Sequence, residues 1–484
     1  MKSSSSFSIF DFANQLNSLK KGAAVKNNIT FSLSLQKEIH KHKYSMDSEI
    51  NKAFKELNIK SLLNRSNIMK QKGYSTASII YLMVLLPFLK QYLSYLWSGK
   101  ACQSQINAQK DTYYRFLNHE YFNWRKLVYL LALKVINNTG DVPLKQKVLI
   151  ADDTLAPKTG KKMEMVSYHF DHTRKQSMLG YQCLQLGYHN GMNFFPIDVA
   201  FKTSRNRPNT TVRDIDKRTN GWQRRKEAFN KKTDMLVEMA NRAWNAGIDA
   251  SFMLFDSWFA HDDVISKIHN TGYGVICRLK RGRVKYVYQG KAYTLKQLWQ
   301  NVVKKRTKWL ADYQVKAVSL NVQLPKSGHV QVVFISDGKK QWQAFLSTDQ
   351  DLEASEVLSY YSIRWSIEVF FKDAKQLLYL GSEQSNTFDA VIACYSLSMI
   401  RYLLLVYIFN KSKLIGPIGP LFRELSDDQV YFSMAEEFWR NVKELIIMSS
   451  QLLSDEIDRN NILYILEVIE NVLCNQLDYS TAKL

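Results

Sequence analysis

The order of strand-like and helix-like segments between residues 143 and 282 constrains the fold of this chain more than any other feature. After Pro143, short runs rich in β-branched and aromatic residues alternate with segments of helical spacing. The order is three strands, helix, strand, helix, strand, and the second and third strands flank Asn190-Gly191, a pair typical of hairpin turns. The first helix is expected from Arg224 to about Ala246. This order predicts an α/β fold with a mixed sheet.

The charge balance indicates what kind of partner such a chain binds. There are 66 Lys and Arg residues against 44 Asp and Glu, which gives a formal net charge of +22. A strongly basic protein binds polyanions, and nucleic acid is the first expectation. The two most apolar runs, Ile79–Leu89 and Tyr402–Phe409, are shorter than the roughly 18 residues that span a bilayer, so no membrane partner is expected. Five scattered cysteines without a C-x-x-C pair, and an N-terminus unlike a secretory signal, favour a reducing cytoplasm.

The segments on either side of the α/β region differ from it and from each other. Residues 1–143 have helical spacing with several lysines, which predicts a helical, basic DNA-binding domain; the alternative is an ordinary helical bundle with a solvated lysine face. Short alternating runs predict an all-β insertion at 283–350, between two parts of one core at 144–282 and 351–385. Residues 386–484 are expected to form a helical C-terminal region that mediates dimerisation.

Two of the predicted strands end abruptly in carboxylates. One is the run Val148-Leu-Ile-Ala-Asp152-Asp153, and the other is Phe252-Met-Leu-Phe-Asp256. An ionised Asp beside a buried strand is unfavourable unless a partner there requires it. Strand-end Asp residues also serve as helix caps and turn formers, so neither run alone identifies a site.

A third carboxylate lies on a predicted helix at about residues 360–375. At about 100° per residue, Tyr361, Arg364, Glu368 and Lys375 fall within about 60° of one another. This stripe is either an exposed ladder with one ion pair or the wall of a cleft, and the apolar residues on the other faces of the helix favour the cleft. Three carboxylates without a Cys or His ligand set form an oxygen-only site that suits two Mg²⁺ ions, or Mn²⁺, in phosphodiester displacement. The Arg and Lys would hold phosphates, and the Tyr could donate to a phosphate oxygen.

These residues together resemble a known family. The spacing Y-x2-R-x3-E-x6-K, at Tyr361, Arg364, Glu368 and Lys375, is the signature of the bacterial insertion-sequence transposases of family four, a branch of the DDE transposases. The resemblance covers roughly residues 145–385. It extends to Asp153-Thr154 with Lys158 and Gly160 after it, to Phe170-Asp171-His172, and to Asp256-Ser-Trp-Phe.

The resemblance implies a ribonuclease-H-like catalytic core that a β insertion interrupts between its second Asp and its Glu. By position, the catalytic and metal-binding residues would be Asp153, Asp256 and Glu368. Asp153 is preferred because the family's residue precedes a Thr, and Asp152 remains the alternative metal ligand. The Tyr, Arg and Lys of the signature would hold the DNA backbone near the cut. A Trp of the insertion would stack on a base flipped from the transposon end, with Trp342 the first candidate and Trp309 the second.

A basic segment at residues 202–232 lies between the two Asp strands. It is either a solvated basic loop or a clamp on the DNA backbone, and its position favours the clamp. The candidate DNA contacts are Arg205, Arg207, Arg213, Arg224, Arg225 and Lys226.

These expectations describe a DNA transposase. It would bind double-stranded DNA at the inverted-repeat ends of its element as a homodimer, cut there by Mg²⁺-dependent hydrolysis, and join the 3′-hydroxyl ends to target DNA. The resemblance places it in the bacterial cytoplasm at the nucleoid. The alternatives are a nuclease of the same fold that does not transpose, and a domesticated DNA-binding protein without catalysis.

Overall fold

A computed structural model describes residues 46–96, 108–140, 143–171, 174–204, 212–338, 341–383 and 385–427. The chain divides into two compact units, residues 50–424 and a second that comprises residues 1–49 with 425–484. The sheet and the candidate site both lie in the first unit. Arg205, Arg207, His172 and residues 428–484 of the predicted dimerisation region lie outside the described residues.

Helices precede the sheet in the chain. They are α3 (Met46–Glu56), α4 (Ile59–Arg65), α5 (Thr76–Leu85), α6 (Lys110–Leu117) and α7 (Trp124–Asn137). The side chain of Asn123 accepts a hydrogen bond from the Lys126 N–H at 3.0 Å and so caps α7. The buried face of α7, which includes Leu131 and Val135, packs against α14 and β4.

The described residues contain a mixed sheet of twelve strands, which confirms the predicted α/β class. Five strands form the half of the sheet that carries the candidate site: β1 (Val148–Pro157), β3 (Gln176–His189), β4 (Phe194–Lys202), β5 (Phe252–Phe255) and β6 (Gly274–Arg278). Their order is β4-β3-β1-β5-β6; β4, β3 and β1 are antiparallel neighbours, and β5 and β6 run parallel to β1. The short strand β2 (Ser167–Asp171) pairs with β3. This order and these directions are consistent with a ribonuclease-H-like domain.

A hairpin turn joins β3 to β4 where the sequence predicts one. Asn190 Oδ1 accepts hydrogen bonds from the N–H groups of Met192 and Asn193 at 3.1 and 2.8 Å. Gly191 has a φ of 90°, a conformation that side-chain-bearing residues rarely adopt. The Asn-Gly pair therefore sets the register in which β3 and β4 meet.

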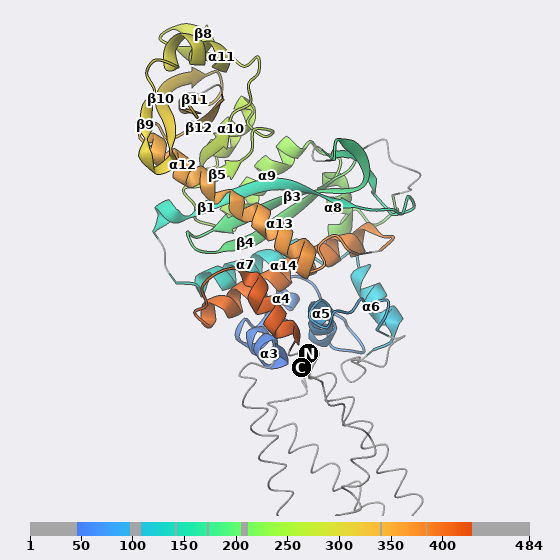
Figure 1. Ribbon diagram of the computed structural model, residues 1–484. Coiled ribbons are helices and arrows are strands. Elements are labelled where there is room, and N and C mark those ends of the chain that lie inside the picture. The colour runs from blue at the N-terminus through green and yellow to red at the C-terminus, as the bar shows by residue number, and fades with distance from the viewer. Residues whose placement is uncertain are drawn as a thin grey trace, which may run out of the picture. The chain divides into compact units, whose positions relative to one another are not determined.

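The strands between residues 283 and 350 extend the same sheet beyond β6. They are β7 (Tyr286–Tyr288), β8 (Lys291–Tyr293), β9 (Lys308–Leu310), β10 (Val315–Leu324), β11 (Gly328–Ser336) and β12 (Trp342–Ser347). β12 pairs with β6, so this segment is continuous with the sheet rather than a separate layer. It also contains α11 (Leu295–Leu298), a π-helical turn (Trp299–Val303) and a short 3₁₀ turn (Ala311–Tyr313), so the expectation of an all-β insertion is too simple. These elements gather at one end of the sheet (Figure 1).

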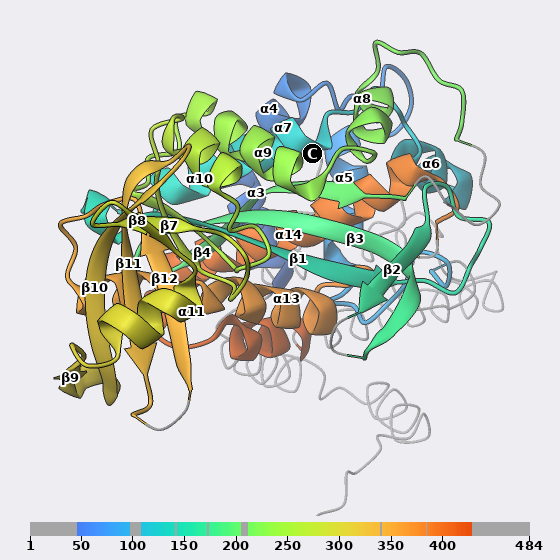
Figure 2. The same ribbon diagram turned by 90° about the horizontal axis from the view of Figure 1, so that it is seen from above.

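Helices cover both faces of the sheet around β1. They are α8 (Asn220–Glu227), α9 (Lys232–Asn245), α10 (Asp262–His269), α12 (Ala354–Ile363), α13 (Trp365–Leu377) and α14 (Phe388–Lys411). Figure 2 shows α9 and α13 on opposite sides of β1. The helix expected from 224 to 246 is interrupted after α8, because Ala228 O accepts a hydrogen bond from Thr203 N at 2.9 Å and ties the chain to the end of β4.

In the part of the chain that the structure describes, α14 alone is long and apolar enough to cross a membrane by length and composition. Of its most apolar window, 89% is buried inside the protein, as in a core helix. The helix belongs to the region predicted to mediate dimerisation, but it is packed against α7 and β4 within its own unit.

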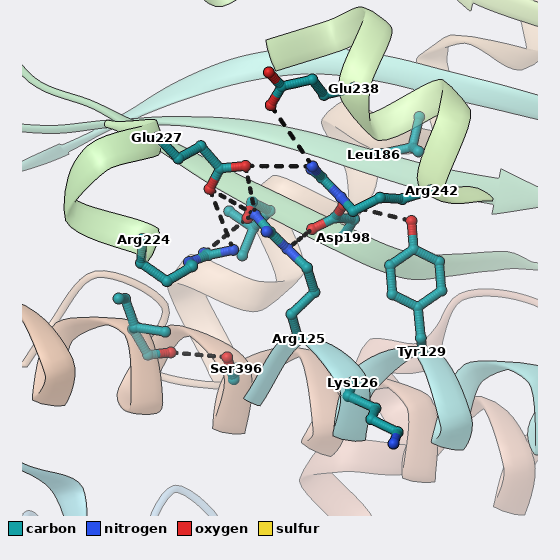
Figure 3. A network of polar contacts seen from close by, with 12 residues as sticks. Arg125, Lys126, Tyr129, Leu186, Asp198, Arg224, Glu227, Glu238, Arg242 and Ser396 are labelled. Atoms are coloured by element: carbon teal, nitrogen blue, oxygen red, sulfur yellow. Dashed lines mark hydrogen bonds and ion pairs between the residues drawn. The ribbon is translucent and has the colours of Figure 1, made fainter. Parts of the chain in front are cut away.

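A buried ion network fixes α7 and α9 to β4 (Figure 3). Asp198 of β4 accepts from Arg125 Nε of α7 and from Arg242 Nε of α9, each at 2.8 Å. Arg125 Nη2 also lies 2.7 Å from Glu227 Oε2 at the end of α8. Burial would raise the pKa of Asp198, but the charges of Arg125, Arg242 and Arg224 outweigh it and lower that pKa. Asp198 therefore stays ionised in the interior, as the anchor of three elements.

Candidate active site

The register between β1 and β5 places Asp152 beside Asp256. The strands are parallel, with Ala151 opposite Phe255, and each Asp is the next residue in its chain. Side chains at matching positions of neighbouring strands point to the same face of a sheet. The two carboxylates therefore leave the same face, at the carboxyl ends of adjacent parallel strands.

Arg364 joins Asp152 to Glu368. The residue lies at the junction of α12 and α13, and Glu368 lies one turn further along α13. Arg364 Nη1 donates to Asp152 Oδ2 at 2.8 Å, and Nη2 donates to Glu368 Oε1 at 2.5 Å. The side chains of Arg364 and Asp152 are only 15% and 20% exposed, so solvent screens this contact little. Helix α13 thus covers the face of β1 from which Asp152 points.

Asp256 has a guanidinium partner of its own. Its Oδ1 lies 2.9 Å from Arg278 Nη2, at the end of β6, and accepts the Ser257 N–H at 2.6 Å. Tyr361 of α12 faces the same area: burial and the charge of Asp256 raise its pKa, Arg364 opposes them, and the result is about 12. Its Oη is buried and has no hydrogen-bond partner among the described residues. A protonated phenol without an acceptor is thus held beside the carboxylates.

The electrostatic state of Asp152 reflects its surroundings. Burial raises its pKa to about 6, and the negative charges of Asp153 and Asp256 add to the rise. Arg364 and the Asp153 N–H, which donates to Asp152 Oδ1 at 2.8 Å, act in the opposite direction. A further cation beside this carboxyl group would favour its ionised form and lower its pKa.

Asp153 points to the opposite face of β1, because successive side chains of a strand alternate. Its Oδ2 accepts from Gln182 Nε2 at 2.7 Å and forms an ion pair with Lys232 at the start of α9. The structure therefore brings Asp152, Asp256 and Glu368 to one face and leaves Asp153 on the other. The sequence favoured Asp153 and kept Asp152 as the alternative; it is Asp152 that lies on the same face as Asp256 and pairs with the arginine that Glu368 also contacts.

Lys375 lies further along α13, over the end of β1. Its Nζ donates to Thr154 Oγ1 at 2.5 Å and to Leu155 O at 3.2 Å. Thr154 is two residues beyond Asp152 and shares its face. Tyr361, Arg364, Glu368 and Lys375 therefore all face β1 and the ends of its neighbouring strands, although α12 and α13 meet at Arg364 instead of forming one regular helix.

The described part of the basic segment, residues 202–204 and 212–232, includes buried as well as exposed arginines. Arg224 and Arg225 are 8% and 3% exposed, which corrects the expectation that they contact DNA. Arg225 bridges Glu164 and Asp389, with nitrogen–oxygen distances of 2.7–2.9 Å. The described residues of the segment that keep surface exposure include Arg213, with a side chain 44% exposed, and Lys226.

Trp342 is also an interior residue. It is 8% exposed, stacks on Trp299 with ring centroids 5.3 Å apart, and lies under the Arg281 guanidinium at 4.2 Å. A base has no access to a ring covered in this way, so the expectation that Trp342 is a stacking platform is corrected. Trp309, the second candidate, is 60% exposed on β9.

The carboxylates have the donor chemistry for a hard divalent cation, but the present arrangement differs from that of a metal site. Within the described residues, no group of three or more His, Cys, Asp or Glu side chains is placed to hold a metal ion. Arg364 lies between Asp152 and Glu368, and Arg278 holds Asp256. Carboxylate oxygens are ligands that suit Mg²⁺ or Mn²⁺. In this structure, however, the positive charge beside these carboxylates comes from the guanidinium groups of Arg278 and Arg364.

Two residues that contact the candidate carboxylates were not identified from the sequence. Arg278 ends β6, directly beside the strand of Asp256, and Lys232 begins α9. A signal for the first existed, because the carboxyl ends of neighbouring parallel strands meet at one sheet edge and a polar residue there faces the same site. Lys232 is the last residue of the basic segment at 202–232, but nothing in the sequence indicated that it pairs with Asp153.

Comparisons with known proteins indicate the kind of protein to which this chain is similar. Residues 99–297 match the family model described as DDE superfamily endonuclease, and residues 223–403 match the model described as Transposase DDE domain. No curated protein matches the chain significantly. The two matched regions contain all three carboxylates and support a transposase-type nuclease with DNA as its substrate.

Proposed function

We propose that the chain is a DNA transposase in which Asp152, Asp256 and Glu368 are the catalytic carboxylates. The proposal is supported by one observation: the side chain of β1 and that at the end of β5 leave the same face of the sheet, and Arg364 joins the first of them to Glu368 of α13. The matches to DDE endonuclease and transposase domains support phosphodiester chemistry on DNA. Asp152 replaces Asp153 in the expected triad because Asp153 faces the other way.

The three carboxylates would hold Mg²⁺, two ions in the expected scheme, with Mn²⁺ as a substitute. The bound ions would activate a water or a 3′-hydroxyl and stabilise the leaving oxygen. Tyr361, whose raised pKa keeps its phenol protonated, would donate a hydrogen bond to a phosphate oxygen. Arg364 and Lys375 would hold the DNA backbone once phosphates replace their present partners.

The biological reaction that we propose is cut-and-paste transposition of an insertion sequence of family four. The protein would bind the inverted-repeat ends of its element, release them by cleavage, and transfer the 3′-hydroxyl ends to target DNA. Joining two ends requires at least two active sites, so the active species would be a homodimer on DNA. The Y-R-E-K spacing at Tyr361, Arg364, Glu368 and Lys375 supports this assignment.

Single carboxylate variants test the assignment of the triad. Asp152→Asn, Asp256→Asn and Glu368→Gln should each abolish Mg²⁺-dependent cleavage of an inverted-repeat duplex, while binding in a gel-shift assay survives. Asp153→Asn is the matched control: it removes the same charge from the neighbouring residue and should retain cleavage. Full loss in Asp153→Asn with retained cleavage in Asp152→Asn would refute the assignment.

A second assay separates a transposase from a nuclease of the same fold. A pre-cut inverted-repeat end with a free 3′-hydroxyl is incubated with the full chain, Mg²⁺ and a supercoiled target. A transposase gives joined products that the Glu368→Gln variant does not form. Cleavage of uncut ends without any joined product would favour the nuclease.

A further inference from the structure

A small cavity lies where three helices begin. Its volume is about 130 Å³, too small for a nucleotide but sufficient for one ion of phosphate size. The lining comes from the loop before α7 and the start of that helix, and from the starts of α8 and α14. The described residues that line it do not include the three candidate carboxylates, so the cavity is separate from the candidate active site.

Two side chains of the lining have buried N–H donors without an acceptor. Trp124 is 3% exposed, and its indole Nε1 has no hydrogen-bond partner among the described residues. Within the same part of the chain, Nη1 of Arg224, a residue 8% exposed, also lacks one; Glu227 Oε2 lies 3.6 Å away, beyond hydrogen-bonding distance. An indole and a guanidinium can donate but not accept. A ligand that satisfies both groups must therefore supply acceptor atoms.

The arginines beside the cavity outnumber the carboxylates that pair with them. Among the described residues, the ion network of Figure 3 joins three arginines to two buried carboxylates, namely Arg125, Arg224 and Arg242 to Asp198 and Glu227. Glu238 contacts this network from the surface, 3.9 Å from Arg242 and with 47% of its side chain exposed. Burial, and then the charge of Arg125, lower the pKa of Arg224 to about 9. A buried cation without a counter-charge of its own is unfavourable, and an anion in the adjacent cavity would supply that charge.

The other titratable groups of the lining do not supply it. Asp389 already pairs with Arg225 at 2.7 Å and with Arg213 at 3.7 Å. Burial lowers the pKa of His119, so its imidazole is neutral at pH 7. The starts of α7, α8 and α14, helices of 14, 8 and 24 residues, add the positive ends of three helix dipoles, which favour negative charge.

We propose that this cavity binds one small oxyanion, phosphate or sulfate, as a structural ligand. Its oxygens accept hydrogen bonds from Trp124 Nε1 and Arg224 Nη1, and its charge balances the third arginine of the network. The ion thereby connects the starts of α7, α8 and α14. The inference is independent of the proposed function, because it involves neither DNA cleavage nor the candidate carboxylates.

Binding of inorganic phosphate to the full chain tests the proposal. Equilibrium dialysis against radiolabelled phosphate, in a chloride buffer with EDTA, gives the stoichiometry and the dissociation constant. We expect a single saturable site per chain, from which unlabelled sulfate displaces the phosphate. Phosphate should also raise the unfolding temperature as its concentration rises, because it binds the folded state.

Two variants and two matched controls locate the site. Trp124→Phe removes the indole N–H but keeps an aromatic ring, so it should weaken phosphate binding about tenfold in a protein that stays folded. Arg224→Gln removes the charge and should abolish saturable binding; if this variant does not fold, Trp124→Phe still decides. Trp222→Phe, at an indole of α8 outside the lining, and Arg218→Gln, at a side chain 88% exposed, should leave the affinity unchanged.

Three results would overturn the proposal. Without saturable binding of phosphate or sulfate, the cavity is filled by water alone. Unchanged affinity in Trp124→Phe would mean that the ion binds elsewhere on this basic chain. A terminal phosphate of a DNA strand has the same chemistry as the free ion. If a 5′-phosphorylated oligonucleotide displaced the label far better than inorganic phosphate, and its unphosphorylated counterpart did not, the cavity would be a site for a strand end instead.

Discussion

Replacing Arg225 by Ala should destabilise the fold strongly without acting through DNA contacts. Arg225 Nε and Nη2 donate to the two oxygens of Glu164 at 2.8 and 2.7 Å, and Nη1 and Nη2 donate to those of Asp389 at 2.9 and 2.7 Å. The three side chains are between 3% and 5% exposed. The substitution leaves two buried carboxylates without their main cation.

The expected loss follows from this geometry. Removing one partner of a buried ion pair lowers the free energy of unfolding by about 3–5 kcal/mol. Glu164 keeps backbone N–H donors from Phe388 and Arg213, at 2.8 and 3.0 Å, so the lower half of that range applies. With an m-value of about 3 kcal/mol/M, the urea midpoint should fall by roughly 1 M.

The same substitution should change the pH dependence of stability. Burial acts to raise the pKa of Glu164, but hydrogen bonds from Arg225 and the backbone of Phe388 outweigh it, and the pKa lies below its ordinary value of 4.5. A depressed pKa stabilises the fold above pH 4.5, and this contribution is lost as the pH falls through the folded-state value. The difference between wild type and variant should therefore shrink below about pH 4.5.

Urea unfolding at pH 7 and pH 4, followed by circular dichroism, measures both effects. Lys226→Ala is the matched control: Lys226 is the next residue and is exposed, so its loss should change stability by no more than about 0.5 kcal/mol. If Lys226 contacts the DNA backbone, Lys226→Ala should reduce the slope of log binding constant against log salt concentration for a DNA duplex by about one. Arg225→Ala should leave this slope unchanged. A stable Arg225→Ala protein with reduced salt dependence would refute the reasoning.

Three further predictions concern Asp152, the insertion and the hairpin. The pKa of Asp152 is about 6 in the folded protein, against an ordinary value of 3.8, so the folded state binds the proton more tightly than the unfolded state. The protein therefore loses stability as the pH rises from about 4 to 6. Asp152→Asn should remove this loss and raise the free energy of unfolding at pH 7 by up to about 3 kcal/mol, as measured by urea unfolding. Trp342→Ala should lower stability by about 3–5 kcal/mol, because it removes a buried ring stacked on Trp299, and thermal unfolding measures this. Gly187→Ala should destabilise by about 1–3 kcal/mol, since a Cβ there would lie 2.0 Å from the Phe194 ring, and Phe194→Leu in the same chain should recover part of the loss in a thermal-shift assay.

The parts of the fold that the sequence predicts well are those with a local cause. The apolar runs of β1 and β5 and the Asn190-Gly191 turn have their own residue preferences, and they occur where expected. The break between α8 and α9 has a distant cause, the hydrogen bond between Thr203 and Ala228. The helical turns after residue 294 likewise interrupt strand-like sequence. Tertiary contacts of this kind override local preference.

The difference between local and distant causes also explains why the sequence predicted a DNA contact for Arg225, which is buried. Arg225 looks like a surface cation because its acidic partners are 61 and 164 residues away in the chain. Charge counted along a segment cannot reveal a counter-charge that the fold supplies. The choice between Asp152 and Asp153 is of the same type: consecutive residues of a strand face opposite sides. The position of α13 over one face is the reason that we propose Asp152 as the catalytic residue.

Arg364 connects the resting arrangement of the candidate site to the reaction proposed for it. Asp152 and Glu368 share this guanidinium, and Asp256 has that of Arg278, so each carboxylate has a cationic partner without DNA. Glu368 is 34% exposed, and an ion pair so open to solvent contributes little net stability. A DNA phosphate competes for the same fork of donors that now holds two carboxylates. If a phosphate took Arg364, Asp152 and Glu368 would lose their neutralising charge at the step where the proposed reaction requires them as ligands. Under this proposal the guanidinium would couple the arrival of the DNA backbone to the availability of the carboxylates, and a lysine, with a single point charge, could not replace it in both contacts.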